Sequence, residues 1–235
     1  MFSALVSPKA TFEDIARRPS WVAPVILLTV VSLAATVLLT QRVGWLRIVQ
    51  QQIERNPRAA ERLNELSLTQ REQVLARNGQ IYKVVAYKKY VVAVVGPLVI
   101  VAIVALILMG LANLLCGASV KYRTSLAVTT HAWMPAAIAG LLVIIVLLLK
   151  SPDAVDVERL VASNLGASLE SDSPRWLFSL ASAVDLFAFW RILLLAIGLA
   201  AVTPKKVTVG KALAIVFGAY AVFALLAAGV AAAFS

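Results

Sequence analysis

The stretch that decides the fold runs from Tyr90 to Cys116 and reads YVVAVVGPLVIVAIVALILMGLANLLC. It holds no charged residue, and it is longer than the roughly 20 apolar residues that an α-helix needs to cross the hydrocarbon core of a bilayer. Because lipid offers the backbone no hydrogen-bond partner, each segment must pair its own peptide groups, and a helix is the default. The stretch therefore predicts a transmembrane helix.

Four further apolar runs lie on either side of it. The full set of expected spans covers residues 21–39, 90–117, 125–149, 177–202 and 207–234. The fourth run reaches the length of a span only if Asp185 and Arg191, which lie inside it, are tolerated. We therefore predict an all-α polytopic membrane bundle of five transmembrane helices, forming a single domain over residues 1–235.

The composition agrees with a membrane protein. Hydrophobic residues make up 61% of the chain and charged residues 14%, and the mean hydropathy is +0.87. A soluble domain is typically about 45–50% apolar and about 25% charged. The net charge of +10 comes from residues that flank apolar runs, without an RNA-binding or zinc pattern. The expected partner of these cations is therefore the lipid bilayer and not a nucleic acid.

The basic residues also predict an orientation. Five spans place the termini on opposite sides of the membrane; we call the N-terminal side A and the C-terminal side B. Side A collects basic residues next to the spans: Lys9, Arg17, Arg18, Lys121, Arg123, Lys205, Lys206 and Lys211. The connection 150–175 on side B is net acidic, although the long stretch 40–89 there carries ten Lys or Arg against four Glu. The positive-inside rule favours a cytoplasmic N-terminus and an outside C-terminus.

The first loop, 41–88, has helical patterning of its own. Trp45, Leu46, Val49 and Ile53 recur at helical spacing. Asn56-Pro57 predicts the start of a short helix through Leu66, and Thr69 a second one that ends at Asn78-Gly79. Such amphipathic helices lie on the membrane surface or pack over the bundle, and a plain solvated helical loop is the alternative. At the N-terminus, the segment 11–14 predicts a short interfacial helix that leads into the first span.

Polar residues inside the spans are the candidate functional residues, because each is costly in hydrocarbon. Asp185 and Arg191 are six positions apart, about 240° of helical turn, and so they do not share a face. Each charge therefore needs a partner on another helix, a water molecule, or a position at the membrane interface. The two interpretations are a polar pathway or partner contact, and a structural hydrogen bond or a helix start close to Asp185. Asn113 is a further polar candidate near the end of the second span.

His131 and Pro135 form a second candidate group. A histidine can relay protons, but no carboxylate lies near His131 in the sequence. Pro135 removes the hydrogen bond to the carbonyl four residues earlier, which is that of His131. We therefore expect a kinked helix here. Gly96-Pro97 predicts another kink or break early in the second span.

Gly210, Ala214 and Gly218 recur at every fourth position of the last span. Small residues at this spacing let helix backbones approach closely. They are our candidates for helix packing, either within the bundle or with another chain.

The sequence offers little for catalysis. Cys116 and His131 are the single cysteine and the single histidine, and the chain contains no GxSxG, P-loop or HExxH motif. Asp185 is the single acid within the spans. These observations predict a protein that is not an enzyme and that uses no cofactor or metal.

Two stretches resemble a known family. They are residues 122–135, YRTSLAVTTHAWMP, and residues 185–199, DLFAFWRILLLAIGL, the latter followed by Lys205-Lys206 and a last span that opens at Gly210. Both are similar to the Yip-domain family of five-span membrane proteins, named for members that interact with Rab/Ypt GTPases. The opening segment 7–19, SPKATFEDIARRP, resembles its bacterial branch.

The resemblance implies a role in membrane organisation or trafficking-like processes, and for the bacterial branch a place in the inner membrane. An N-terminal region of only about 20 residues differs from the eukaryotic members and argues against a Rab-type GTPase as the partner. The leading hypothesis is a multi-pass scaffold or adaptor, whose partners are a second copy or other membrane proteins. The alternative is a small transporter or channel that uses the intramembrane polar residues.

Overall fold

The computed structural model describes residues 2–54, 65–157, 159–170, 173–204 and 206–233, with the backbone alone described at 46, 49, 52–54 and 75–87. The α-helices are α1 (Ser3–Val6), α2 (Pro8–Arg17), α3 (Val22–Val43), α4 (Trp45–Glu54), α6 (Leu68–Cys116), α7 (Tyr122–Ala132), α8 (Met134–Leu149), α9 (Arg175–Ala183), α10 (Leu186–Val202) and α11 (Val209–Ala233). Two short 3-10 turns, η1 (Pro152–Ala154) and η2 (Leu165–Ser168), lie between α8 and α9. The described residues pair as β-structure only in one isolated bridge, between Asn164 and Asp185.

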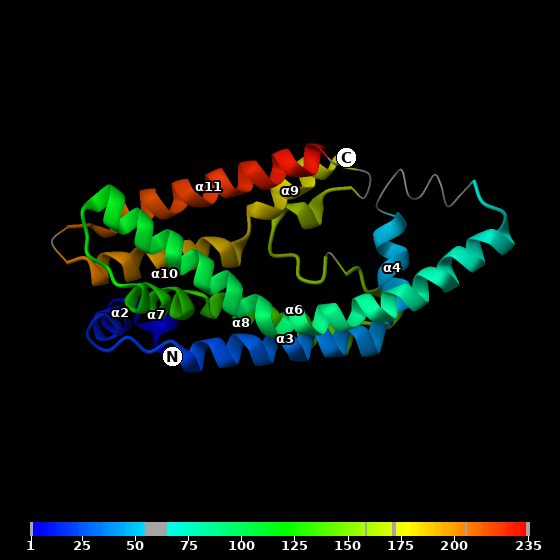
Figure 1. Cartoon of the computed structure of the whole chain (residues 1–235), viewed down its shortest axis with the longest axis horizontal. Coiled ribbons are helices and arrows are strands. Elements are labelled where there is room, and N and C mark those ends of the chain that lie inside the picture. The colour runs from blue at the N-terminus through cyan, green and yellow to red at the C-terminus, as the bar shows by residue number, and fades with distance from the viewer. Residues whose placement is uncertain (1, 55–64, 158, 171–172, 205, 234–235) are drawn as a thin grey trace.

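Four helical segments are long and apolar enough to cross a membrane: Val22–Val43, Lys88–Cys116, Tyr122–Leu149 and Val209–Ala233. The predicted all-α membrane bundle is thus confirmed, and the chain is an integral membrane protein. Figure 1 shows these segments running along one long axis, which is the arrangement of a polytopic bundle.

The run 177–202 differs from the continuous helix that we expected. It forms two helices, α9 of 9 residues and α10 of 17 residues. Asp185 stands between them in an extended conformation, and its side chain accepts a hydrogen bond from the backbone N–H of Ala188 at 2.7 Å. Because a carboxylate satisfies the free N–H groups at a helix start, Asp185 starts a new helix instead of lying within one. Both helices pack against α11. Leu186–Val202 is an apolar helix shorter than the four spanning segments, so a fourth crossing made by α9 and α10 together stays a prediction.

Helix α6 is much longer than its span. It begins with a capping box, in which Ser67 and Gln70 bond to each other's backbone N–H groups, and it continues for 49 residues. It continues through Asn78-Gly79, where we expected an end, and through Gly96-Pro97, where we expected a kink or a break. The break is thus excluded, whereas Pro97 lies inside the helix and Figure 1 shows α6 changing direction along its length. At 1.5 Å per residue it is about 74 Å long, against about 30 Å of hydrocarbon. Residues 68–87 therefore extend beyond the span on side B as an arm (Figure 1).

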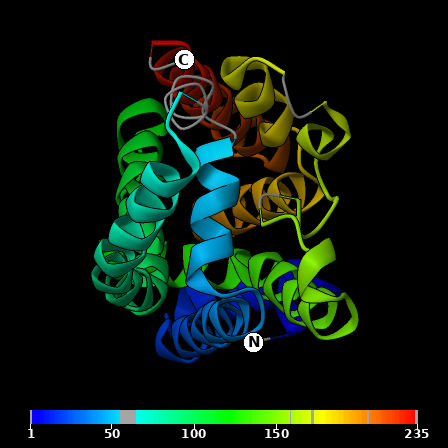
Figure 2. The same cartoon turned by 90° about the vertical axis from the view of Figure 1, so that its right-hand side faces the viewer.

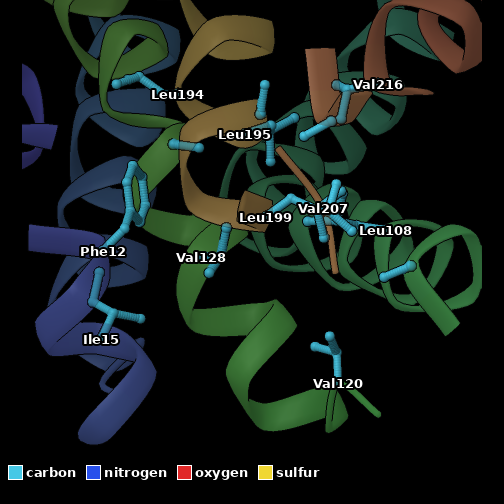
Figure 3. Close-up of a cluster of buried hydrophobic side chains, with 14 of the residues drawn as sticks. Phe12, Ile15, Leu108, Val120, Val128, Leu194, Leu195, Leu199, Val207 and Val216 are labelled. Atoms are coloured by element: carbon cyan, nitrogen blue, oxygen red, sulfur yellow. The ribbon is translucent and has the colours of Figure 1, made fainter. Parts of the chain in front are cut away.

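The largest cluster of buried side chains lies on side A, where α2, α6, α7, α10 and α11 meet (Figure 3). Phe12 is fully buried and Ile15 is 3% exposed, and both belong to this cluster. We expected α2 to lie at the interface, whereas the structure packs it against α10 and α7. The segment before the first span is therefore part of the bundle.

Helix α4 packs over the end of the bundle on side B (Figure 2). Ile48 is 1% exposed and joins Val43, Leu147 and Val155 in a small core. Arg47 forms an ion pair with Asp153, and Gln51 bonds to the backbone of the segment after η1. Of the alternatives for the first loop, the structure thus places this part over the bundle. The expected helix from Asn56-Pro57 to Leu66 falls almost entirely outside the described residues.

Hydrogen bonds from two basic side chains connect elements at the ends of the bundle. On side B, Arg42 donates from Nε to the carbonyl of Leu147 at 3.2 Å and from Nη2 to that of Leu148 at 3.1 Å, so the ends of α3 and α8 lie together. On side A, Lys206 Nζ donates to the carbonyl of Gly117 at 2.6 Å. These bonds therefore hold the ends of α3 and α8 together on side B, and the loops that follow α6 and α10 together on side A.

Candidate functional site

Asp185 is satisfied within the chain. One carboxylate oxygen accepts the N–H of Ala188, and the other accepts a hydrogen bond from the hydroxyl of Ser163 at 2.5 Å. The backbone bridge between Asn164 and Asp185 holds the segment before η2 beside it. These contacts make Asp185 the anchor between the 150–175 connection and the start of α10.

His131 is bonded to its own helix. Its Nδ1 lies 2.9 Å from the carbonyl oxygen of Ala127, one turn earlier, so the ring donates from Nδ1, and the side chain is 5% exposed. The helix breaks two residues later at Trp133, with Pro135 as the second residue of α8. Pro135 cannot donate to the carbonyl of His131, which explains the break. The structure gives both residues a local structural role.

Asn113 closes the turn at the end of α6. Its amide nitrogen donates to the carbonyl of Val120 at 3.1 Å, and its amide oxygen accepts the N–H of Val120 at 2.8 Å. Gly117, at φ 57°, supplies the left-handed residue that ends the helix. Asn113 therefore fixes the short loop between α6 and α7.

Arg191 differs from these three residues. Its guanidinium carbon lies 5.1 Å from the centre of the Trp133 ring, a cation–π contact between α10 and the junction of α7 and α8. Within the described part of the chain, no carboxylate forms a salt bridge with it, Asp185 included. Arg191 is thus a cation inside the spans with an aromatic partner and, among the described residues, no carboxylate in direct contact.

Arg191 faces a cavity of about 670 Å³. Most of the wall is apolar and comes from α3, α6 and α8. Lys88 and Lys89 line the cavity where α6 enters its span, on side B, and Arg191 lines it together with Trp133, at the start of α8. None of the described lining residues is acidic. The cavity therefore joins an apolar wall to three cations.

We call the end of the cavity at Lys88 and Lys89 its mouth. Lys89 lies there beside aromatic side chains. Lys89 Nζ is 5.6 Å from the centre of the Trp45 ring, and that ring meets Tyr90 edge to face with centroids 6.1 Å apart. The Tyr90 hydroxyl bonds to Thr40 Oγ1 at 2.6 Å. The ends of α3, α4 and the α6 span are therefore joined at the mouth.

The structure brings Asp185 within electrostatic reach of Arg191, but it does not join the sequence candidates by direct contacts. Among the described residues, no hydrogen bond or ion pair joins His131, Asp185 and Arg191 to one another. A transporter that relays charge through all three would need such a connection. The cavity itself was not predicted from the sequence, since Trp133 and Arg191 are 58 positions apart and meet only in the fold. The pair Lys88-Lys89 at the start of a span was the available signal.

The closest backbone approaches also lie elsewhere than expected. A Cβ added at Gly210 or Gly218 would have no neighbour within 4 Å. A Cβ at Gly198 would lie 2.5 Å from Val128 Cγ1, and one at Gly140 would lie 2.6 Å from Val31 Cγ1. A Cβ at Gly166, in η2, would lie closer still, 2.2 Å from Ser182 Oγ. Within the described part of the chain, Gly166, Gly198 and Gly140 are thus the glycines on which packing depends. Ala136, four residues before Gly140, was a small-residue signal that sequence reasoning missed.

Comparison with known families gives one match that spans nearly the whole chain. Residues 2–232 match the model of the Yip1 domain. The chain belongs to the Yip1 domain family. Searches of curated proteins and of solved structures found no match. The Yip1 match covers the bundle from α1 to α11 as one unit, and it includes both stretches whose resemblance we noted in the sequence.

Proposed function

We propose that this Yip1-family protein is a scaffold or adaptor that works in membrane organisation or in a trafficking-like process, without catalysing a reaction. The observation that carries the proposal is the arm of α6. Residues 68–87 continue the span as one helix beyond the membrane, and a capping box stabilises its free end. A rigid helix that projects from a bundle presents a surface to a partner.

The intramembrane polar residues support the same proposal. Asp185, His131 and Asn113 bond to backbone or to a neighbouring loop, which explains their presence without a reaction. Helix α4, fixed by Arg47 and Gln51 to the segment after η1, gives the base of the arm a stable support.

We further propose a bacterial inner membrane, with the N-terminus in the cytoplasm and the C-terminus outside. The basic residues next to the spans on side A support this orientation. The arm then lies on the outer face of that membrane. Its partner is a second copy of the chain or another membrane protein, and a Rab-type GTPase does not fit that location.

Site-specific photocrosslinking in native membranes tests the adaptor role. We would place a photoreactive residue at Glu72 or Gln73, both exposed on the arm, and as a control at Val222 or Leu226, exposed on α11. We expect a reproducible protein adduct from the arm positions and lipid adducts from the control positions. Absence of any reproducible protein adduct from the arm would contradict the proposal.

A further inference from the structure

Arg191 has no ion-pair partner among the described residues, and the field of the nearby Asp185 carboxylate, which is bonded to Ala188 and Ser163, compensates its charge only in part. A charge without a direct counterion is among the most costly groups within a span. The face of Trp133 offsets part of that cost, since a ring attracts a cation less strongly than a carboxylate does. Arg191 also lines the cavity. An anion in the cavity would provide the missing countercharge.

The cavity has the size and surface of a ligand site. Its volume of about 670 Å³ falls within the range of about 300–1,000 Å³ that is usual for ligand pockets. Val92, Ile100 and Ala137 are among its apolar lining residues, and Ser32 and Thr36 add hydroxyls on the α3 side. Such a wall fits a hydrocarbon chain better than it fits a hydrated ion.

The charge of the cavity is of one sign. Lys88, Lys89 and Arg191 line it, and the described lining includes no acid. Lys88 is exposed, and Lys89 and Arg191 are partly exposed. The cations therefore stand where a molecule from the bilayer or its surface can reach them.

We propose that this cavity binds one anionic phospholipid from the surrounding bilayer. The phosphate takes the anionic position that Arg191 lacks, the two lysines complete the positive surface at the mouth, and one acyl chain lies on the wall formed by α3, α6 and α8. Free phosphate has the same anionic group, but it has no hydrocarbon chain that could pack against the apolar wall. The proposal is independent of the adaptor role.

The test is lipid retention by the full-length protein. We would reconstitute it in nanodiscs of phosphatidylcholine and phosphatidylglycerol, extract it gently and count bound lipids by native mass spectrometry. We expect one retained phosphatidylglycerol. Arg191→Gln should lower the affinity about tenfold, which is the usual effect of losing one charge-assisted contact. The double variant Lys88→Gln, Lys89→Gln should lower it as well, and this variant carries the test if Arg191→Gln does not fold.

A variant that fills the cavity distinguishes the contribution of the apolar wall to lipid binding from that of the charges. Gly96→Leu adds a side chain that fills the cavity, and the only contact of its Cβ within 4 Å is Val92 Cγ1 at 3.6 Å. We expect it to lower lipid retention with all three cations in place. The matched controls are Lys150→Gln on side B and Arg123→Gln on side A, neither of which lines the cavity, and these should retain the lipid.

Three results would overturn the proposal. The first is equal retention by the wild type, Arg191→Gln and the double lysine variant. The second is an equal loss with Lys150→Gln, which would indicate general attraction of anionic lipid to a basic surface. The third is full displacement of the lipid by inorganic phosphate, which would indicate a site for a free anion.

Discussion

Single polar side chains decide where the helices of this bundle begin and end. Asp185 starts α10, Asn113 fixes the turn after α6, and Pro135 accounts for the break after Trp133. The sequence indicated each of these residues as polar or disruptive, and their spacing excluded a bond between Asp185 and Arg191 within one helix. Their partners could not be predicted, because Ser163 and Trp133 come from other elements.

We predict that Asp185→Ala destabilises the protein by about 1–3 kcal/mol, since it removes both the helix cap and the acceptor of the Ser163 hydroxyl. Unfolding of the purified protein in mixed detergent micelles measures the change. Asp185→Asn is the matched control: an amide oxygen still caps a helix, and the loss should be smaller. Equal losses would show that the charge, and not the cap, matters.

We predict that Gly198→Ala destabilises the protein by about 1–3 kcal/mol, because the new methyl group would meet Val128 and the ring of Phe12 inside the core. The same unfolding assay measures it. Gly218→Ala is the control, since its Cβ would have open space, and alanine favours a helix over glycine by up to about 1 kcal/mol. A destabilised Gly218→Ala with an unchanged Gly198→Ala would contradict the packing described here.

The contrast between these glycines shows what a sequence motif can and cannot give. The repeat Gly210, Ala214 and Gly218 matches a packing pattern, yet these positions are exposed on α11. That these residues allow close packing against a helix of a second chain stays a prediction. Gly198 stands alone in its run, and only the fold shows that Phe12, nearly 190 positions earlier, packs against it.

At the scale of elements, hydropathy predicted where the apolar helices lie, but it did not predict where a helix is divided or continued. The run 177–202 is apolar throughout apart from two charges, so periodicity alone favours one helix, whereas the capping chemistry of Asp185 divides it. In α6 the opposite occurs: Asn78-Gly79 has the composition of a helix end, yet the helix continues through it to Cys116. Local propensity is overridden when a longer helix is favoured by its context.

The contact between α4 and the segment after η1 gives a prediction at this scale. Gln51 accepts the N–H of Val157 at 3.1 Å and donates to the carbonyl of Val155 at 2.7 Å. In Gln51→Ala we expect faster hydrogen exchange at Val157, about five- to thirtyfold for a loss of about 1–2 kcal/mol of local stability. Gln50→Ala, about 100° around the same helix, is the control. Unchanged exchange at Val157 in Gln51→Ala would exclude the contact.

At the scale of the whole molecule, the structure separates the two ends of the bundle. Side A holds α2 and the loops after α6 and α10, joined by the bond from Lys206 to Gly117. Side B holds α4, the arm of α6 and the 150–175 connection, joined by Arg42, Arg47 and Gln51. The sequence predicted this division from the number of spans alone. It could not predict that α2 is buried or that a cavity opens between α3, α6 and α8, since both depend on contacts between distant segments.

We predict that the chain crosses the membrane five times, with the broken pair α9 and α10 as the fourth crossing. The most direct measurement is labelling of single cysteines with a membrane-impermeant thiol reagent, in a Cys116→Ser background, at Glu13, Gln70 and Asp153, together with a topology reporter fused after Ser235. We predict that Gln70, Asp153 and the reporter lie on one face of the membrane and Glu13 on the other. A reporter on the same face as Glu13 would show that α9 and α10 do not cross, and would contradict the five-crossing bundle.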